Sequence, residues 1–380
     1  MMSPASKREL VETIRPRYLK ASRTEKSNII DEFIAITGYH RKHVIRVLGR
    51  GYPARKKKKS GRKKKYQGEV VQALVQIWEI CGRICSKRLQ PFLPEMVMVL
   101  ERHKEIQFKA GVKELLLSMS CATIDRCLQK ERFEKRRGIS TTKPGTLLKK
   151  AIAVRTFMDW SEDRPGFVEV DLVAHCGGSV EGQFCYTLTA VDISTGWTEC
   201  LAVKNRTQEA VFAQIVQLRD RLPFPLLGLD SDNGAEFIND ILYRYCLKEE
   251  ITFTRSRPYR KNDQAHVEQK NWSVVRRTVG YDRYDTPEQL SLLQSIYADL
   301  RLYVNFFQPV LKLMGRKQLQ ERKFIKVYDQ AATPFQRTLQ SEEIPVQIKA
   351  KLMNAYLQCN PVALKNKIDD NVACLWHLPR

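Results

Sequence analysis

Between about residues 155 and 285, short apolar strands alternate with amphipathic helices, and few folds accommodate that order. Three apolar segments separated by Gly-rich turns, 167–173, 184–191 and 197–203, are typical of consecutive strands. The segments that follow are predicted, in order, as a helix at 208–222, a strand at 226–229, a helix at 235–248, a strand at 251–254 and a helix at 263–279. This order predicts a mixed α/β sheet.

Apolar spacing predicts which side of two of these helices faces the core. In the first helix the stripe consists of Val211, Ile215, Leu218 and Leu222. In the second, the residues expected to point inward are Ile238, Ile241, Leu242 and Tyr245.

The chain before this region is helical and basic. Two helices are predicted on either side of Gly38, the first with an apolar face of Ile29, Ile30, Phe33 and Ile34, the second with Val44, Ile45 and Leu48 inward. A helix, a Gly-containing turn and a basic helix are typical of the helix-turn-helix, which would place Arg41, Lys42 and Arg46 on DNA. A plain helical hairpin fits the same pattern equally well. A second helical block at about 69–133 repeats the outline, with Ser120 as the predicted N-cap of its last helix.

Basic segments and composition shifts divide the chain. The segment Arg55–Tyr66 has nine basic residues among twelve, which predicts an extended linker that follows DNA phosphates, or a solvated spacer. We expect a helix-turn-helix region at 1–52, a basic linker at 53–67, a second helical or helix-turn-helix region at 68–136, a basic linker at 137–157, an α/β core at 158–285 and a helical C-terminal region at 286–380. In the last of these, Asn360 before Pro361 predicts the capped start of a final helix.

A net charge of +23 favours a polyanionic partner, and nucleic acid is the commonest large polyanion inside cells. A ribosomal or membrane-surface role would use the same charge, so charge alone names no activity. The ten cysteines show no disulfide framework, the N-terminus lacks the apolar core of a signal peptide, and no apolar run approaches the length of a membrane span. These features predict a cytoplasmic protein with reduced thiols and no membrane partner.

Three acidic residues lie where predicted strands end or helices begin. Asp171 lies in the first strand, Asp232 follows the fourth strand, and Glu268 lies in the helix at 263–279. Three carboxylates brought together would suit Mg²⁺ or Mn²⁺, because these hard ions prefer carboxylate oxygens. Two such ions can activate the attacking oxygen and stabilise the leaving oxygen of a phosphodiester at once. An isolated acid at a strand end is more often a cap or turn residue, and spacing alone does not separate Asp232 from its neighbour Asp230.

A family resemblance selects among these acids. Ser231-Asp232-Asn233-Gly234-Ala235-Glu236-Phe237 follows a strand, 60 residues separate Asp171 from Asp232, and 35 separate Asp232 from Glu268. The segment from about 166 to 284 thereby resembles the catalytic core shared by retroviral integrases and integrase-type insertion-sequence transposases. The whole chain is similar to bacterial insertion-sequence transposases with tandem N-terminal helix-turn-helix regions. The His40, His43, Cys81 and Cys85 spacing does not match the zinc module of retroviral integrases, so zinc is not expected.

The resemblance implies an RNase H-like fold and a catalytic triad of Asp171, Asp232 and Glu268 that holds two Mg²⁺ ions, with Mn²⁺ as a substitute. It implies 3′-end cleavage at the ends of a mobile DNA element, followed by attack of the new 3′-hydroxyl on target DNA. The implied partners are double-stranded element ends and target DNA, bound by a homo-multimer. Two alternatives remain open: a DNA-binding regulator with an inactive core, and an RNase H-like nuclease that cuts without joining.

Residues beside the predicted site offer DNA contacts. Those expected to contact DNA phosphates or bases near the ions are Arg255, Arg257, Arg260, Lys261, Gln264 and Asn271. A solvated basic helix would look the same in sequence. His266 is expected to point away from Glu268, His175 to occupy a turn after the first strand, and Trp272 to pack in the core.

Overall fold

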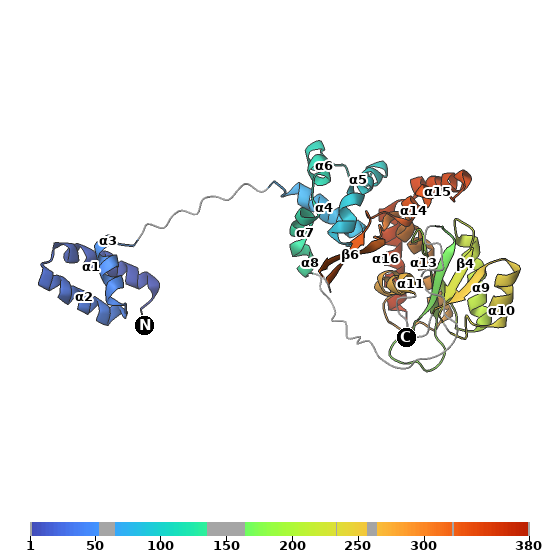
Figure 1. Ribbon diagram of the computed structural model, residues 1–380, viewed down its shortest axis with the longest axis horizontal. Helices are drawn as coiled ribbons and strands as arrows, with labels where there is room; N and C mark the ends of the chain where they lie inside the picture. The colour runs from blue at the N-terminus through green and yellow to red at the C-terminus, as the bar shows by residue number, and fades with distance from the viewer. Residues whose placement is uncertain are drawn as a thin grey trace. The chain divides into compact units, whose positions relative to one another are not determined.

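Three helices form the first of two units into which the chain divides, Met1–Lys65 and Tyr66–Arg380 (Figure 1). The computed structural model describes residues 2–52, 65–134, 164–232, 234–256, 264–320 and 323–378. Most of the predicted linker at 53–67, all of that at 137–157, and Arg257, Arg260 and Lys261 lie outside the described residues.

The first unit consists of α1 (Pro4–Lys20), α2 (Arg23–Thr37) and α3 (Arg41–Arg50). Ser22 and Glu25 form a capping box at the start of α2, and Gly38 ends that helix in the left-handed conformation, at φ 67°. The apolar faces meet in a small core of Val11, Tyr18, Ile29, Ile30, Phe33, Val44, Val47 and Leu48. The prediction for Ile45 was wrong: its side chain is exposed and Val47 points inward instead, because residues 44, 47 and 48 share one helical face.

The predicted mixed sheet is confirmed in the second unit, with strand order β3-β2-β1-β4-β5. Its strands are β1 (Phe167–Ala174), β2 (Tyr186–Asp192), β3 (Thr198–Val203), β4 (Gly228–Ser231) and β5 (Thr252–Arg255). The pairs β1–β2 and β2–β3 are antiparallel, whereas β4 runs parallel to both β1 and β5. The carboxyl ends of β1 and β4 therefore lie at the same edge of the sheet.

Helices cover both faces of the sheet (Figure 1). On one face α9 (Gln208–Arg221) and α10 (Asp240–Lys248) pack on the apolar side chains of β1, β2 and β3. On the other, residues 265–279 form a continuous helical segment, α11 (Ala265–Lys270), a π-helical stretch η1 (Asn271–Arg276) and α12 (Arg277–Val279), followed in sequence by α13 (Pro287–Phe307).

The predicted helix at 235–248 begins five residues later than expected. Asn239 is its N-cap and accepts a hydrogen bond from the backbone N–H of Leu242 at 2.9 Å. Ile238 and Ile241 are accordingly exposed rather than inward, while Leu242 is buried as predicted.

Helices from both ends of the second unit share one core. They are α4 (Glu69–Ile80), α5 (Ser86–Arg102), α6 (Ala110–Leu117), α7 (Cys121–Cys127), α14 (Pro334–Gln340), α15 (Val346–Gln358) and α16 (Pro361–His377). The short helix α8 (Gln129–Glu134) follows α7. Ser120 caps α7 and Asn360 caps α16, which confirms both predicted caps. Tyr303 of α13 donates to the Ile80 carbonyl at 2.6 Å and thereby joins α13 to the end of α4.

The region at 286–380 is not wholly helical, which corrects that part of the prediction. Strands β6 (Leu313–Gln320) and β7 (Lys323–Tyr328) form an antiparallel hairpin. Four of the five residues at 324–328 of β7 are β-branched or aromatic, a composition that favours a strand over a helix.

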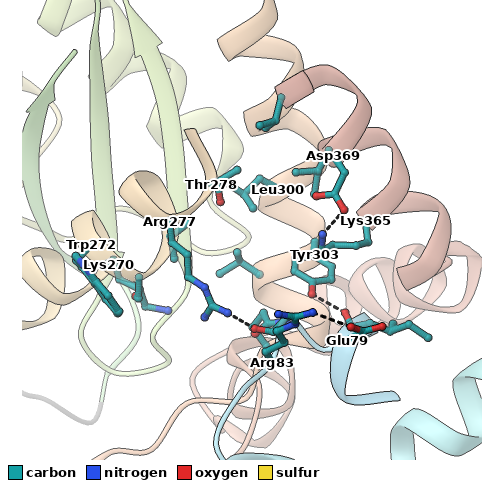
Figure 2. Close-up of a pocket in the computed structure, with 18 of the residues that line it drawn as sticks. Glu79, Arg83, Lys270, Trp272, Arg277, Thr278, Leu300, Tyr303, Lys365 and Asp369 are labelled. Carbon is teal, nitrogen blue, oxygen red and sulfur yellow. Dashed lines mark hydrogen bonds and ion pairs between the residues drawn. The ribbon is translucent and has the colours of Figure 1, made fainter. Parts of the chain in front are cut away.

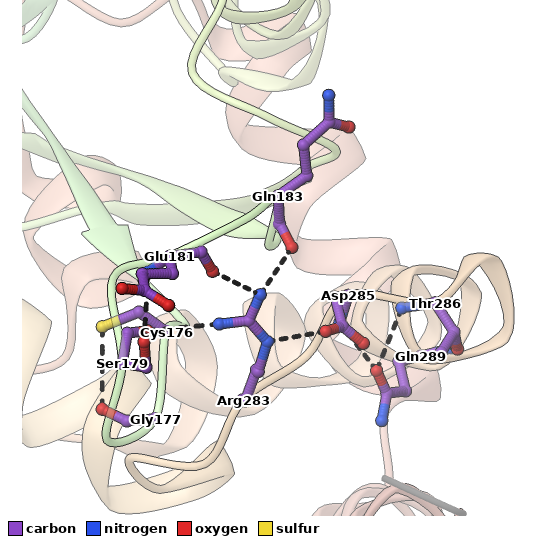
Figure 3. A network of polar contacts seen from close by, with 9 residues as sticks. All are labelled: Cys176, Gly177, Ser179, Glu181, Gln183, Arg283, Asp285, Thr286 and Gln289. Atoms are coloured by element: carbon purple, nitrogen blue, oxygen red, sulfur yellow. Dashed lines mark hydrogen bonds and ion pairs between the residues drawn. The ribbon is translucent and has the colours of Figure 1, made fainter.

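Arg283 fastens the loop between β1 and β2 to the start of α13. Its guanidinium donates to the backbone carbonyls of Ser179, Glu181 and Gln183 and pairs with Asp285 at 2.6 Å (Figure 3). Gln289 then accepts the backbone N–H groups of Asp285 and Thr286, so the loop and the helix cap form one network.

Two further expectations concern the whole chain. All ten cysteines lie among the described residues and none forms a disulfide. Within those residues, no helix combines the length and the apolar character that crossing a bilayer would require.

Candidate active site

Asp171, Asp232 and Glu268 come from three different elements of the second unit. Asp171 lies in β1 opposite Thr189 of β2, Asp232 directly follows β4, and Glu268 lies in α11. Because β1 and β4 are parallel neighbours, residues at their carboxyl ends approach one another. Glu268 is exposed, and Asp171 and Asp232 are half-buried.

The three carboxylates are electrostatically coupled. Burial, together with the negative charges of Asp232 and Glu268, raises the pKa of Asp171 to about 6. The backbone N–H of Leu172 at 2.8 Å and the Asn271 amide at 2.6 Å act in the opposite direction, because both donate to the Asp171 carboxylate. A bound cation would relieve the same repulsion.

The side chains stop short of a preformed ligand set. Within the described residues, no three His, Cys, Asp or Glu side chains stand close enough together to hold a metal ion. Asp232 Oδ1 instead accepts the backbone N–H of Gly234 at 3.0 Å. The assignment of this trio as metal ligands therefore stays a prediction.

Asn271 lies beside Asp171 rather than on an outer surface. Its Nδ2 donates to Asp171 Oδ2, and its own Oδ1 is buried without a hydrogen-bond partner among the residues that the structure describes. Asn271 begins the π-helical stretch η1, in which an extra residue per turn changes which side chains face the sheet. The sequence pattern predicted an ordinary helix here and did not indicate the π-helical stretch.

Glu169 is a residue that the sequence analysis did not single out and that the structure places beside the candidate site. Its carboxylate, 1% exposed, accepts the backbone N–H groups of His266 at 3.0 Å and Val267 at 2.9 Å. It thereby caps the first turn of the helix that carries Glu268. Burial raises its pKa to about 8. The sequence signal that could have identified Glu169 is its position two residues before Asp171, which places both acids on the same face of β1.

Replacing Glu169 with alanine should destabilise the second unit by about 1–3 kcal/mol, because two buried N–H groups lose their acceptor. Glu169→Gln keeps an acceptor oxygen and should lose less. Urea unfolding followed by tryptophan fluorescence measures both. Equal losses in the two variants would show that the carboxamide oxygen does not replace the carboxylate as a cap.

The remaining predicted contact residues are placed as follows. Arg255 ends β5 and pairs in the ladder with Ser231, one residue before Asp232, so it flanks the site. Gln264 is buried at the start of α11, and its Nε2 has no hydrogen-bond partner within the described part of the chain. In the first unit, Lys42 and Arg46 are exposed, and Arg41 pairs with Asp31.

Two expectations about neighbouring side chains were tested. Trp272 is 63% exposed, so its prediction as a core residue was wrong; it lies in η1, four residues after the exposed Glu268. His175 is fully buried rather than in an open turn: its ring shares a hydrogen bond with Thr187 at 2.7 Å, and Thr187 contacts the Tyr297 hydroxyl at 2.5 Å.

His175 should make the second unit sensitive to acid. Burial, with the charge of Arg276, lowers its pKa from 6.5 to about 3, so between those pH values only the unfolded chain binds this proton. Its contribution to stability is present above pH 6.5 and is lost as the pH falls toward 3. Denaturant unfolding across that range should show a pH slope smaller in His175→Gln than in the wild type by up to about 1.4 kcal/mol per pH unit. Superimposable slopes would contradict the shifted pKa.

Comparison with known proteins shows similarity to a domain family, to a bacterial protein and to a solved structure. Residues 162–261 match the family described as Integrase core domain, a span that contains Asp171 and Asp232 and ends before Glu268. The chain is 43% identical over 344 residues to "Uncharacterized protein y4rM" of Sinorhizobium fredii (strain NBRC 101917 / NGR234), covering 88% of this chain and 96% of that protein. The crystal structure of the catalytic core domain of BIV integrase is 20% identical, with a TM-score of 0.30, and the alignment covers 47% of this chain and 95% of that one.

Proposed function

Because the chain belongs to the family of y4rM and carries an integrase core domain, as integrase-type transposases do, we propose that it cuts DNA strands at 3′ ends and joins them to target DNA. The observation that carries this proposal is the coupling of Asp171 to Asp232 and Glu268, three carboxylates from β1, the β4 end and α11. A buried carboxylate beside two others is costly unless a cation joins them.

The donor set fits hard divalent cations, and we propose two Mg²⁺ ions, with Mn²⁺ as a substitute. Carboxylate oxygens are the protein ligands that Mg²⁺ prefers. The residues that would hold the ions are Asp171, Asp232 and Glu268. When bound, such ions stabilise the charge that develops on both oxygens of a phosphodiester exchange.

The surrounding residues of this chain position the three acids. Asn271 donates a hydrogen bond to one oxygen of Asp171 and so orients this carboxylate. Glu169 accepts a backbone N–H from the first turn of α11, so this contact positions the helix that carries Glu268 relative to β1. Arg255 lies where it can neutralise a phosphate beside Asp232. The sheet gives these groups a rigid support, which catalytic geometry requires.

The three-helix first unit is proposed to bind the ends of the mobile element. Lys42 and Arg46 are exposed on α3, the second helix of the predicted helix-turn-helix, so both are available to DNA. Recognition of two ends implies a homo-multimer on double-stranded DNA.

The deciding experiment is a cleavage assay on duplex DNA taken from the flanks of the encoding gene, with Mg²⁺ and with EDTA. We expect Mg²⁺-dependent nicks that leave 3′-hydroxyls and products in which those ends are joined to a target plasmid. Nicks without joining would favour a nuclease. Sequence-specific binding without nicks in either Mg²⁺ or Mn²⁺ would favour a DNA-binding regulator and contradict the proposal.

A further inference from the structure

The helical segment that carries Glu268 also lines a cavity of about 970 Å³. It is lined by α11, η1 and α12, by the turn after α4, and by α13 and α16. Figure 2 shows Lys270, Trp272 and Arg277 entering from one side and Lys365 and Asp369 from the other. This volume falls within the range of small-molecule and cofactor sites, roughly 300–1,000 Å³.

The charge inside the cavity is unbalanced. Of its five cationic side chains, Arg83 pairs with Glu79 at 2.7 Å and Lys365 pairs with Asp369. The cations left without an acidic partner among the described residues are Arg88, Lys270 and Arg277. Three uncompensated cations in one concave site attract a polyanion.

Lys270 is the most informative of the three. It is 7% exposed and makes no hydrogen bond or ion pair with any residue that the structure describes. Burying an ammonium group in this way destabilises a protein. A residue kept at that cost and directed into a cavity indicates an anionic ligand.

Two tryptophans provide aromatic surface in the same cavity as these cations. Trp272 in η1 and Trp376 in α16 line the same cavity, and both are more than half exposed. Exposed aromatic rings beside basic groups are typical of sites where unpaired bases stack while cations hold the phosphates. A base inside a duplex cannot enter a concave site, so the strand must be unpaired there.

We propose that this cavity binds an unpaired nucleotide of a DNA strand, with its phosphate at Lys270, Arg277 and Arg88 and its base on Trp272. The choice of DNA over other nucleic acids rests on the function proposed above. Glu268 and Asn271 belong to the same helical segment as Lys270 and Trp272, so a strand that leaves the candidate active site has a short path to the cavity.

The test uses the full chain in EDTA, so that binding is measured without cleavage. A single-stranded oligodeoxynucleotide containing 5-iodouracil is cross-linked by ultraviolet light, and the attached peptides are identified by mass spectrometry. We expect the peptide that contains Trp272 to carry the label, and Trp272→Ala to abolish that label. Lys270→Met should reduce its yield at limiting DNA about tenfold, the effect of losing one charge-assisted hydrogen bond.

Lys248→Met is the matched control, since Lys248 is exposed on α10 on the opposite side of the sheet and should leave the label unchanged. Thermal unfolding of Lys270→Met should occur at or above the wild-type temperature, because methionine removes a buried charge. If that variant fails to fold, Lys270→Gln takes its place.

An unchanged label in the Lys270 variant, stronger labelling by the matching RNA, or equal labelling by a fully paired duplex would overturn the proposal. A Trp272 label that depends on Lys270, from a chain that cleaves no DNA in Mg²⁺, would support this site and contradict the proposed function. The two proposals can therefore fail separately.

Discussion

Asp232→Asn should abolish Mg²⁺-dependent strand cleavage and leave DNA binding largely intact. The substitution removes one negative charge from the coupled set of Asp171, Asp232 and Glu268 while keeping the shape of the side chain. Loss of groups that only orient metal ligands typically costs 10–100-fold, so loss of a ligand should exceed roughly a hundredfold. Nicking of labelled duplex DNA measures cleavage, and electrophoretic mobility shift measures binding.

The neighbouring Asp230 provides a matched control, because sequence spacing alone did not distinguish it from Asp232. Asp230 lies in β4, and its Oδ1 accepts the Thr254 hydroxyl at 2.7 Å. Asp230→Asn keeps an acceptor oxygen for that bond and should retain most of the activity. Equal loss in both variants, or cleavage that survives Asp232→Asn, would contradict the assignment of the trio.

Local sequence patterns correctly predicted the succession of strands and helices along this part of the chain. Apolar segments between Gly-rich turns predicted β1, β2 and β3, and the stripe of Val211, Ile215 and Leu218, all three buried, predicted α9. These elements satisfy local preference and tertiary packing together, so a pattern within a few residues was sufficient.

Errors arose where a boundary or a helical register depended on distant contacts. The helix α10 starts at Asp240 because the side chain of Asn239 caps it. The prediction began the helix at residue 235 because it counted Ile238, which precedes this cap, as part of the inward face. Trp272 was predicted to pack in the core, but it lies in the π-helical stretch that begins at Asn271 and is 63% exposed. No short window of sequence specifies such a stretch.

The candidate site was predictable only in part, for the same reason. The positions of Asp171, Asp232 and Glu268 followed from spacing and resemblance. The role of Glu169 did not, because it depends on a contact with Val267, 98 residues away in the chain. The cavity beside Lys270 likewise joins helices from both ends of the second unit.

Phe33→Ala should unfold the first unit and leave the second unit folded. Phe33 is fully buried in a core of only eight buried apolar residues. Phe→Ala substitutions in cores cost about 3–5 kcal/mol, which is as much as the whole stability of many domains of this size, roughly 3–5 kcal/mol. The cores of the second unit contain no residue of the first unit, so the unfolding temperature of the second unit should not change. Calorimetry should show loss of the transition of the first unit alone.

Ile36→Ala is the control on the same helix, since Ile36 is 56% exposed and its truncation leaves no cavity. If the first unit recognises element ends, Phe33→Ala should lose sequence-specific binding to them while Ile36→Ala keeps it. Residual Mg²⁺-dependent nicking of unrelated DNA should persist in both variants, because the three acids belong to the second unit. A single shared transition that shifts in Phe33→Ala would show that the two units unfold together, and undiminished end binding by the unfolded unit would place end recognition elsewhere in the chain.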